Sequence, residues 1–385
     1  MLERSFNGTR LKEGRVYRGL TLTDLADNLN VSKQMISKYE NGKSTPSFEV
    51  IMKMCNILNF PKDYFYEESI NVKTGNTYFR SLLTSSKRER EMQYDRIKYV
   101  TIIRVLLEEF VDFPSLDLPS MIEDDCNDIE KSAEKLRDYW GIGRKPIRDM
   151  VYLLETKGFV ISTSTLPNKN IDAFGCLQTI GKKDYYSIVL SDNKKSFYRR
   201  QFDVSHELAH IILHDPYLNI NDLSKEEFKQ IEQEANDFAS AFLMPRDEFL
   251  NDVLIHPTDL MHYKSLKKKW GVSIGAMVMR AYKLGVINNA TYQYLQRNIS
   301  QKGWRTKEPF DDIKEINQPV SMQQAIELLI ENDYVSGESL LYRLSKEYGL
   351  TLNASEVEDL IGLEIGYLSN SKQEIPNNIV KLKDI

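Results

Sequence analysis

Three of the five histidines in the chain lie close together, at His206, His210 and His214, in the run Phe202-Asp-Val-Ser-His-Glu-Leu-Ala-His-Ile-Ile-Leu-His. Residues four apart on an α-helix lie one turn apart on the same face, so His206 and His210 can bind one metal ion. Glu207 follows the first of them, where its carboxylate can take a proton from water at the metal. The run therefore predicts a buried helix that carries a zinc site, with Glu207 as general base.

A catalytic zinc site uses three protein ligands, so a third must be found. His214 lies eight residues from His206, which is about 12 Å of helix rise, so both cannot reach one ion on an unbroken helix. We therefore predict a supporting role for His214 behind the ligands rather than a bond to the metal.

The next predicted helix, over 224–244, offers two carboxylates for the third position. Glu232 falls on the apolar stripe of this helix, whereas Glu234 points about 160° away. A carboxylate on an apolar face is costly unless it is paired or binds a metal. Glu232 is therefore the predicted third ligand, with Asn236 one turn on to orient a ligand. Glu234 remains the alternative if Glu232 lies at the exposed edge.

Together, His206-Glu-Leu-Ala-His-Ile-Ile-Leu-His and Glu232-Gln-Glu-Ala-Asn-Asp-Phe-Ala-Ser-Ala-Phe-Leu-Met-Pro resemble the ImmA/IrrE family of metallopeptidases. These are zinc enzymes of bacteria and their mobile elements, and some cleave repressors of the helix-turn-helix type. The resemblance covers roughly 75–310. It implies Zn²⁺ held by His206, His210 and Glu232, with Glu207 as the catalytic base, in a gluzincin-like peptidase domain over 79–310.

Three short segments rich in β-branched and aromatic residues precede the histidine helix, at 159–166, 173–180 and 185–190. Glycine, asparagine and Lys-Lys-Asp breaks separate them, which is typical of a small antiparallel sheet. Helical periodicity dominates elsewhere, including long helices at 85–112, 129–139 and 146–157. The predicted fold class is mainly α (α+β), with one three-stranded antiparallel sheet.

The N-terminal residues 1–66 predict a five-helix bundle that contains a helix-turn-helix. Thr21 caps a helix with apolar residues on one face, and the turn Asn30-Val-Ser leads into a helix that begins at Lys33 and ends at Gly42. In such a unit the second helix enters the DNA major groove with its N-terminus first. Residues 6–66, with Thr21-Leu-Thr-Asp-Leu-Ala and Ile36-Ser-Lys-Tyr-Glu-Asn-Gly, resemble the Cro/repressor (XRE) family.

The DNA-contacting residues are predicted from their place in this unit. Side chains at the start of the second helix face the base edges, where glutamine suits adenine and lysine suits guanine. Basic and hydroxyl side chains around it suit phosphates. The predicted base contacts are Lys33, Gln34, Ser37 and Lys38, and the predicted phosphate contacts are Arg10, Arg18, Lys43 and Ser44.

Charge and cysteine content fit an intracellular protein in which a basic DNA-binding domain is followed by an acidic remainder of the chain. Residues 1–66 carry ten basic and seven acidic side chains, a net charge of +3, and the whole chain carries −5, which leaves −8 for the rest. The three cysteines are too far apart for a disulfide framework. No apolar run reaches the ~18–20 residues of a membrane span, and the N-terminus shows no secretory signal. We predict a cytoplasmic protein without membrane contact.

These patterns predict a regulator of a prophage or other mobile element that binds double-stranded DNA and cleaves a protein substrate, a repressor or related partner. The alternative is a transcriptional regulator whose zinc site is structural, sensory or vestigial. If the chain forms a homodimer, its operator will be palindromic. The segment 67–78 is the predicted linker, and 311–385 is a predicted helical module for which the sequence indicates no role.

Overall fold

The computed structural model describes residues 5–68, 70, 72–78, 87–119, 128–164, 173–192, 196–215 and 223–370. The chain forms two compact units. The first contains Met1–Val72, Ser85–Phe113 and Val320–Ile385, and the second contains Lys73–Thr84 and Pro114–Pro319. Segments 79–86 and 371–385, which the predicted domains include, lie outside the described residues.

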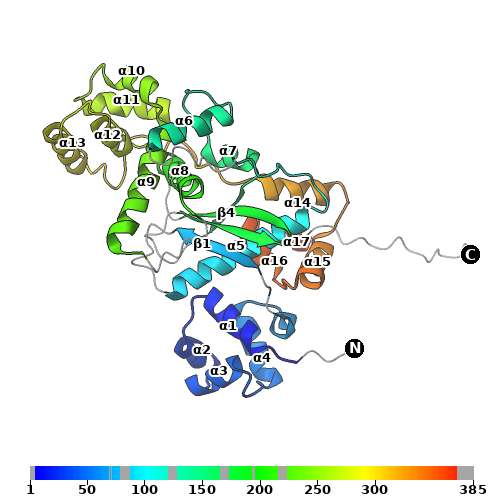
Figure 1. The fold of residues 1–385 in the computed structure, drawn as a ribbon. Coiled ribbons are helices and arrows are strands. Elements are labelled where there is room, and N and C mark those ends of the chain that lie inside the picture. Colours follow the sequence, from blue (N-terminus) through cyan, green and yellow to red (C-terminus); the bar gives the residue numbers. More distant parts are fainter. Residues whose placement is uncertain are drawn as a thin grey trace, which may run out of the picture. The chain divides into compact units, whose positions relative to one another are not determined.

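The described part of the first unit is helical (Figure 1). The five helical segments predicted for residues 1–66 are present, and the fifth is a 3₁₀ helix rather than an α-helix. The elements are α1 (Gly8–Tyr17), α2 (Leu22–Leu29), α3 (Lys33–Glu40), α4 (Phe48–Leu58), the 3₁₀ helix Lys62–Tyr66, α5 (Lys87–Leu107), α14 (Ser321–Glu331), α15 (Gly337–Tyr348), α16 (Ala354–Ile361) and α17 (Tyr367–Asn370).

Side-chain caps fix where the first helices begin. Thr21 and Asp24 form a reciprocal capping box at the start of α2, since the Thr21 hydroxyl accepts from the Asp24 amide and the Asp24 carboxylate accepts from the Thr21 amide. The Ser32 hydroxyl accepts from the Met35 amide at the start of α3. Asn30, between these helices, adopts the left-handed conformation. This turn is what makes the α2–α3 pair a helix-turn-helix.

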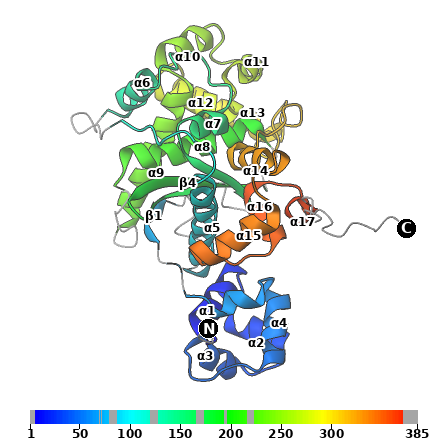
Figure 2. The same cartoon turned by 90° about the vertical axis from the view of Figure 1, so that its right-hand side faces the viewer.

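Helix α1 packs on α5, and helices α14 to α16 pack on α5 from elsewhere in the same unit (Figure 2). Tyr17 of α1 lies with its ring centre 5.0 Å from that of Tyr99 in α5, and both are buried. The compact units thus divide the chain differently from the predicted domains. Residues 87–113 belong to the same compact unit as the helix-turn-helix, and so does the described C-terminal segment 320–370.

An ion pair between Arg18 and Glu356 joins α1 to α16. The Arg18 Nη2 lies 2.6 Å from a Glu356 carboxylate oxygen, and its Nε donates to the carbonyl of Leu58. Tyr17 donates to the other carboxylate oxygen of Glu356. The Glu356 side chain is only 7% exposed, so removal of Arg18 would leave a nearly buried carboxylate with fewer partners.

Arg18→Ala should therefore lower the free energy of unfolding by roughly 1–3 kcal/mol, because breaking a buried pair costs more than breaking an exposed one. Glu356→Gln should cost a similar amount, and the double variant less than the sum of the two. Urea denaturation of the three variants measures this coupling. The matched control is Lys53→Ala, which breaks an exposed pair with Glu49 and should have little effect. Strict additivity would show that the pair makes no contribution.

The second unit contains the sheet and eight helices among its described residues. Its helices are α6 (Ile129–Tyr139), α7 (Met150–Thr156), α8 (Phe197–Leu213), α9 (Lys225–Leu243), α10 (Arg246–Val253), α11 (Leu260–Trp270), α12 (Ile274–Lys283) and α13 (Asn289–Gln301). Its strands are β1 (Lys73–Tyr78), β2 (Val160–Ser164), β3 (Ala173–Ile180) and β4 (Lys183–Ser191).

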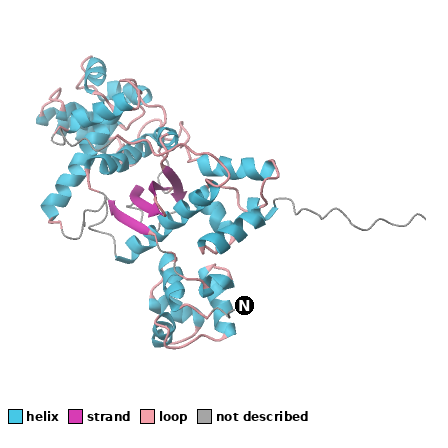
Figure 3. Cartoon of the chain, turned by 45° about the vertical axis from the view of Figure 1, so that its right-hand side comes forward, coloured by secondary structure: helices cyan, strands magenta, loops and turns pink. Residues whose placement is uncertain are grey.

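The fold class, mainly α (α+β), is confirmed, but the sheet differs from the predicted one (Figure 3). It has four strands in the order β1-β3-β4-β2, and β1 comes from the predicted linker. β3 pairs antiparallel with both neighbours, whereas β2 pairs parallel with β4, so the prediction of a purely antiparallel sheet is wrong. β2 and β4 run in the same direction because β3, which lies between them in the sequence, runs opposite to β4.

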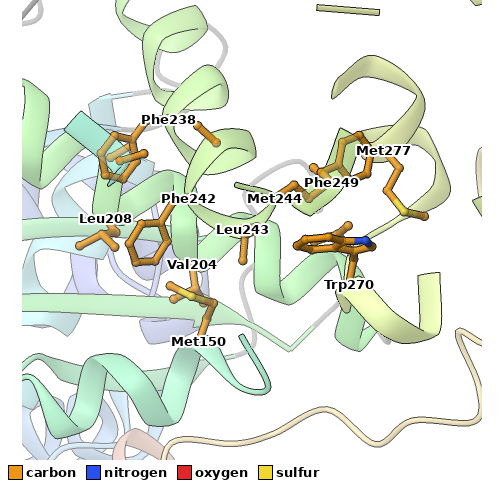
Figure 4. Packing of buried hydrophobic residues seen from close by; sticks show 14 of the residues in the cluster. Met150, Val204, Leu208, Phe238, Phe242, Leu243, Met244, Phe249, Trp270 and Met277 are labelled. Atoms are coloured by element: carbon orange, nitrogen blue, oxygen red, sulfur yellow. The ribbon is translucent and has the colours of Figure 1, made fainter. Parts of the chain in front are cut away.

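The core beneath this sheet anchors α8 and α9 to each other (Figure 4). Val204 and Leu208 of α8 pack with Phe238 and Phe242 of α9, and all four side chains are inaccessible to solvent. Burial of such side chains contributes roughly 1.5–3 kcal/mol each. The two helices are therefore held rigidly at the positions from which the histidines and Glu232 project. Among the described residues, no helix is long and apolar enough to cross a membrane.

Candidate metal centre

The first two ligand candidates project from one face of α8. The Nε2 atoms of His206 and His210 lie 3.0 Å apart, and both side chains are almost fully buried. This spacing follows from the helix alone, because residues four apart overlie each other by one turn. Burial lowers the pKa of His210 to about 3, so its imidazole is neutral near pH 7. A neutral imidazole is the form that binds a metal.

Glu232 reaches the two imidazoles from α9. One of its carboxylate oxygens lies 3.5 Å from His206 Nε2 and the other lies 3.5 Å from His210 Nε2. Burial raises the pKa of Glu232, but the interactions of its carboxylate with His206 and His210 outweigh it and bring the pKa well below its ordinary value. The structure thus brings together the three predicted ligands, with their candidate ligand atoms within 4.8 Å of one another.

This group fits a zinc ion on the chemistry of its donors. Two nitrogens and one carboxylate oxygen match a catalytic zinc site, which keeps a fourth position open. Glu232 Oε1 is buried and accepts no hydrogen bond. A buried carboxylate oxygen without a donor is costly, and a bound cation would remove that cost. Within the described part of the chain, no other group of three such residues meets the geometry of a metal site.

Glu234, the alternative third ligand, lies elsewhere. One of its oxygens is 3.2 Å from His214 Nε2, and the other accepts from the side-chain amide of Gln230. His214 in turn places its Nδ1 3.1 Å from the Nδ1 of His210. A chain of contacts therefore runs from Glu234 through His214 to the far side of the His210 ring, which restrains the orientation of that ring.

Helix α8 ends at Leu213, and His214 already has extended backbone. Its side chain nevertheless turns back to His210, one turn earlier. Burial is the main influence on His214 and lowers its pKa. His214 thus lies against the ring of His210, which is one of the candidate ligands.

Asn236 contacts the backbone of Glu232 rather than its side chain. Its side-chain amide donates to the backbone carbonyl of Glu232, at 2.6 Å, and not to the carboxylate. It can therefore steady the turn of α9 that carries the ligand. Its contact does not orient the ligand oxygens themselves.

Glu207 faces the sheet at Gly175 of β3. Its side chain is buried, and a Cβ atom added to Gly175 of β3 would lie 3.6 Å from Glu207 Oε2. The same atom would lie 3.2 Å from Cγ1 of Ile188 and 3.3 Å from the Ser187 carbonyl. A side chain at Gly175 would thus crowd Ile188 and Ser187 of the neighbouring strand, and it would meet the candidate base at ordinary contact distance. Sequence reasoning missed this residue, although a glycine inside a predicted strand is a signal of close backbone approach.

The predicted base-contacting residues lie on accessible parts of α3. Lys33, Gln34 and Lys38 are exposed, and Ser37 is half-buried. Two of the predicted phosphate contacts, Lys43 and Ser44, follow the helix, where the first is exposed and the second half-buried. Among the described residues of the first unit, no other segment covers these exposed side chains, so a partner molecule can reach them.

The positions of Arg10 and Arg18 do not fit the phosphate contacts that were predicted for them. Arg10 is fully buried, where its guanidinium lies 3.9 Å from the Tyr64 ring centre and 2.8 Å from a Glu13 carboxylate oxygen. Arg18 is paired with Glu356. Both positive charges are used inside the first unit, so neither is presented to DNA in this conformation. The helix pattern gave no sign of this, because Tyr64, which covers Arg10, and Glu356, which pairs with Arg18, lie far along the chain.

Two family models match separate parts of the chain. The helix-turn-helix model matches residues 11–65, and the M78 peptidase model, described as the IrrE N-terminal-like domain, matches residues 154–282. The chain therefore carries an XRE-type helix-turn-helix domain and an IrrE/ImmA-like domain of the M78 peptidase family. The second match contains α8, α9 and the strands β2 to β4, but not β1.

Two curated relatives match a short stretch of the chain. Over 57 residues, 15% of its length, the chain is 37% identical to the SPbeta prophage-derived uncharacterized HTH-type transcriptional regulator YonR of Bacillus subtilis (strain 168), of which the match covers 53%. It is also 35% identical over 57 residues, 15% of this chain, to the HTH-type transcriptional regulator ImmR of the same organism, of which the match covers 45%. The chain thus spans about half the length of the curated relatives it matches.

Proposed function

We propose that this chain is a DNA-binding regulator whose IrrE/ImmA-like domain is a zinc-dependent endopeptidase, which cleaves a repressor or a related regulatory protein in the cytoplasm. The observation that carries the proposal is the buried group of His206, His210 and Glu232 with Glu207 beside it. A zinc site that served structure alone would need no carboxylate next to its ligands.

In this proposal His206, His210 and Glu232 hold the zinc ion, and His214 and Asn236 support them from behind. Bound zinc would supply a Lewis acid that polarises a peptide carbonyl and makes water more acidic. The Glu207 carboxylate accepts the proton of the attacking water and returns it to the leaving amine. Glu207 is suited to this because its side chain is enclosed by α8 and by β3 at Gly175, so bulk water competes little for the proton.

Proteolysis is tested by incubating the zinc-loaded chain with helix-turn-helix repressors from the same genome and identifying products by mass spectrometry. We expect one repressor to be cleaved at a single position, with cleavage lost when a chelator removes the zinc. Absence of cleavage of every such repressor would contradict the proposed substrate class.

A second candidate function is supported by the relatives, both of which are named as HTH-type transcriptional regulators. In that case the zinc site would be structural, sensory or vestigial, and the chain would regulate transcription without proteolysis. The same experiment separates the two functions, because only the first predicts cleaved products. A prophage or mobile-element setting is proposed for both, on the name of the first relative.

DNA binding is proposed for the face of α3, with Lys33, Gln34, Ser37 and Lys38 toward the bases and Lys43 and Ser44 toward phosphates. Gln34→Ala should cost about 1–3 kcal/mol at the preferred operator and relax selection at one base pair, because it removes hydrogen bonds to a base edge. Selection from a random DNA pool, followed by titration at several salt concentrations, measures both effects. A homodimer should select a palindrome.

The matched control for this experiment is Asn56→Ala, an exposed amide on α4. It should leave selection unchanged. Arg18→Ala should also leave the salt slope unchanged, because the Arg18 charge is paired with Glu356 rather than with a phosphate. If Gln34→Ala selects the same sequences as the wild type with equal affinity, α3 is not the recognition helix.

A further inference from the structure

Strand β1 covers the edge of the sheet that lies next to the candidate base. In the order β1-β3-β4-β2, β3 would be an edge strand without it. The segment that matches the peptidase family contains β2, β3 and β4, whereas β1 comes from residues upstream of that segment. In Figure 1 and Figure 2, β1 lies on the side of the sheet where α9 runs. Within the second unit, β1 is thus an additional strand beside the three strands that the peptidase family model covers.

The register places the backbone of β1 beside Glu207. Tyr78 of β1 is the partner of Gly175 in β3, and Thr77 is the partner of Cys176. Partners in antiparallel strands have Cα atoms about 4.5–5.5 Å apart. Gly175 lies against Glu207, because a Cβ atom built on it would lie 3.6 Å from Glu207 Oε2. Tyr78, at the end of β1, therefore lies directly beside Gly175, the residue of β3 that lies against Glu207.

An extended peptide can bind a protein by adding a strand to an exposed sheet edge, where backbone hydrogen bonds give affinity. A protein segment that reached Glu207 in this way would pair with β3 in the place that β1 takes. We propose that the edge of β3 is the docking surface for an extended substrate segment, and that β1 occupies it in the resting chain and must be displaced. This inference rests on the proposed peptidase function and adds to it the mode of substrate binding and its regulation.

Strand β1 has features of a displaceable strand. Its pairing with β3 is interrupted by an irregularity between Thr74 and Thr77. The two residues within this interval are Gly75 and Asn76, types that are disfavoured in strands. A bulge leaves residues of the ladder unpaired and weakens it locally. An incoming segment with better strand-forming residues would therefore replace β1 at low cost.

The pairing can be locked reversibly, because Cys176 is a buried thiol of the wild-type chain and Thr77 is its partner in the register. A disulfide requires Cα atoms about 4.4–6.8 Å apart, which antiparallel partners satisfy. Thr77→Cys should thus form a disulfide with Cys176 on mild oxidation, which peptide mapping without reductant detects. Thr77→Cys combined with Cys176→Ser is the matched control and should form no such link.

Docking is then measured with a fluorescein-labelled peptide of the sequence Val72–Tyr78 in which valine and threonine, which favour strands, replace the residues at Gly75 and Asn76. The peptide is added to the full zinc-loaded chain that also carries Glu207→Gln. Binding, unlike cleavage, needs no turnover, so the result is separate from the test of proteolysis. The oxidised Thr77→Cys chain should bind the peptide at least tenfold more weakly than the reduced chain, and dithiothreitol should restore binding. Thr77→Pro, which removes a backbone donor from β1, should bind it more tightly than the wild-type strand.

Three results would overturn the proposal. One is failure of the disulfide to form, which would show that Thr77 and Cys176 do not pair in solution. Another is equal affinity in the oxidised and reduced states. The last is absence of peptide binding to every variant, including Thr77→Pro, with zinc content unchanged, because the edge of β3 would then not accept a strand.

Discussion

Glu207→Gln should reduce the rate of proteolysis by about 10²–10⁴-fold and leave zinc binding intact. The amide keeps the size of the carboxylate but cannot accept a proton, so the variant loses the general base and not a ligand. Elemental analysis should still find about one zinc per chain. The rate is measured on the repressor that the wild-type chain cleaves.

The matched control for this substitution is Glu226→Gln, at an exposed position in the first turn of α9. It should change neither quantity. Cleavage by Glu207→Gln at the wild-type rate would exclude Glu207 as the base. Loss of zinc would instead show that Glu207 helps to hold the metal site together, and this result would contradict its assignment as a base alone.

Glu232→Gln should weaken zinc binding by at least about 100-fold, whereas Glu234→Gln should weaken it by about tenfold or less. The first variant removes a ligand charge, and the second only loosens the His214 contact behind His210. Competition with a chromogenic chelator gives both affinities. His210→Ala, which removes a ligand nitrogen, provides the scale for a complete loss.

The reverse order of affinities would make Glu234 the ligand and would require α9 to turn about its axis. A large effect from both substitutions would show that the Glu234–His214 contact fixes the ring of His210 more strongly than a supporting contact usually does. His214→Ala then tests that contact directly, because it interrupts the chain between Glu234 and His210.

Several features of this protein follow from residues that are near one another in the sequence. The spacing of His206 and His210 puts them on one helical face whatever surrounds the helix, so the metal motif was readable at once. The helical wheel of α9 separated Glu232 from Glu234 for the same reason, and the structure places them at His206 and at His214 respectively. Helix ends were also readable, because their caps are local: Ser224 and Glu227 form a capping box where α9 begins.

Other features depend on partners that are distant in the chain, and the sequence pattern carries no trace of them. Arg10 and Arg18 lie on a basic helix that would suit phosphates, yet Gly349 and Glu356 meet them from the C-terminal segment. A charge pattern shows that a side chain needs a partner but not which partner it finds.

The sheet shows the same division. The segments of β3 and β4 were predicted as strands because they are short and rich in β-branched and aromatic residues, but the parallel pairing of β2 depends on the path of the chain between strands. β1 was assigned to a linker because the stretch from Glu67 to Thr77 is polar. The open edge of β3 supplies backbone hydrogen-bonding groups that make a strand of it. The sequence thus determined the helices, their caps and the ligand-bearing faces, since these depend on local geometry. Tertiary structure alone decided strand pairing and the partners of buried charges, because both require contacts between residues that the chain brings together only on folding.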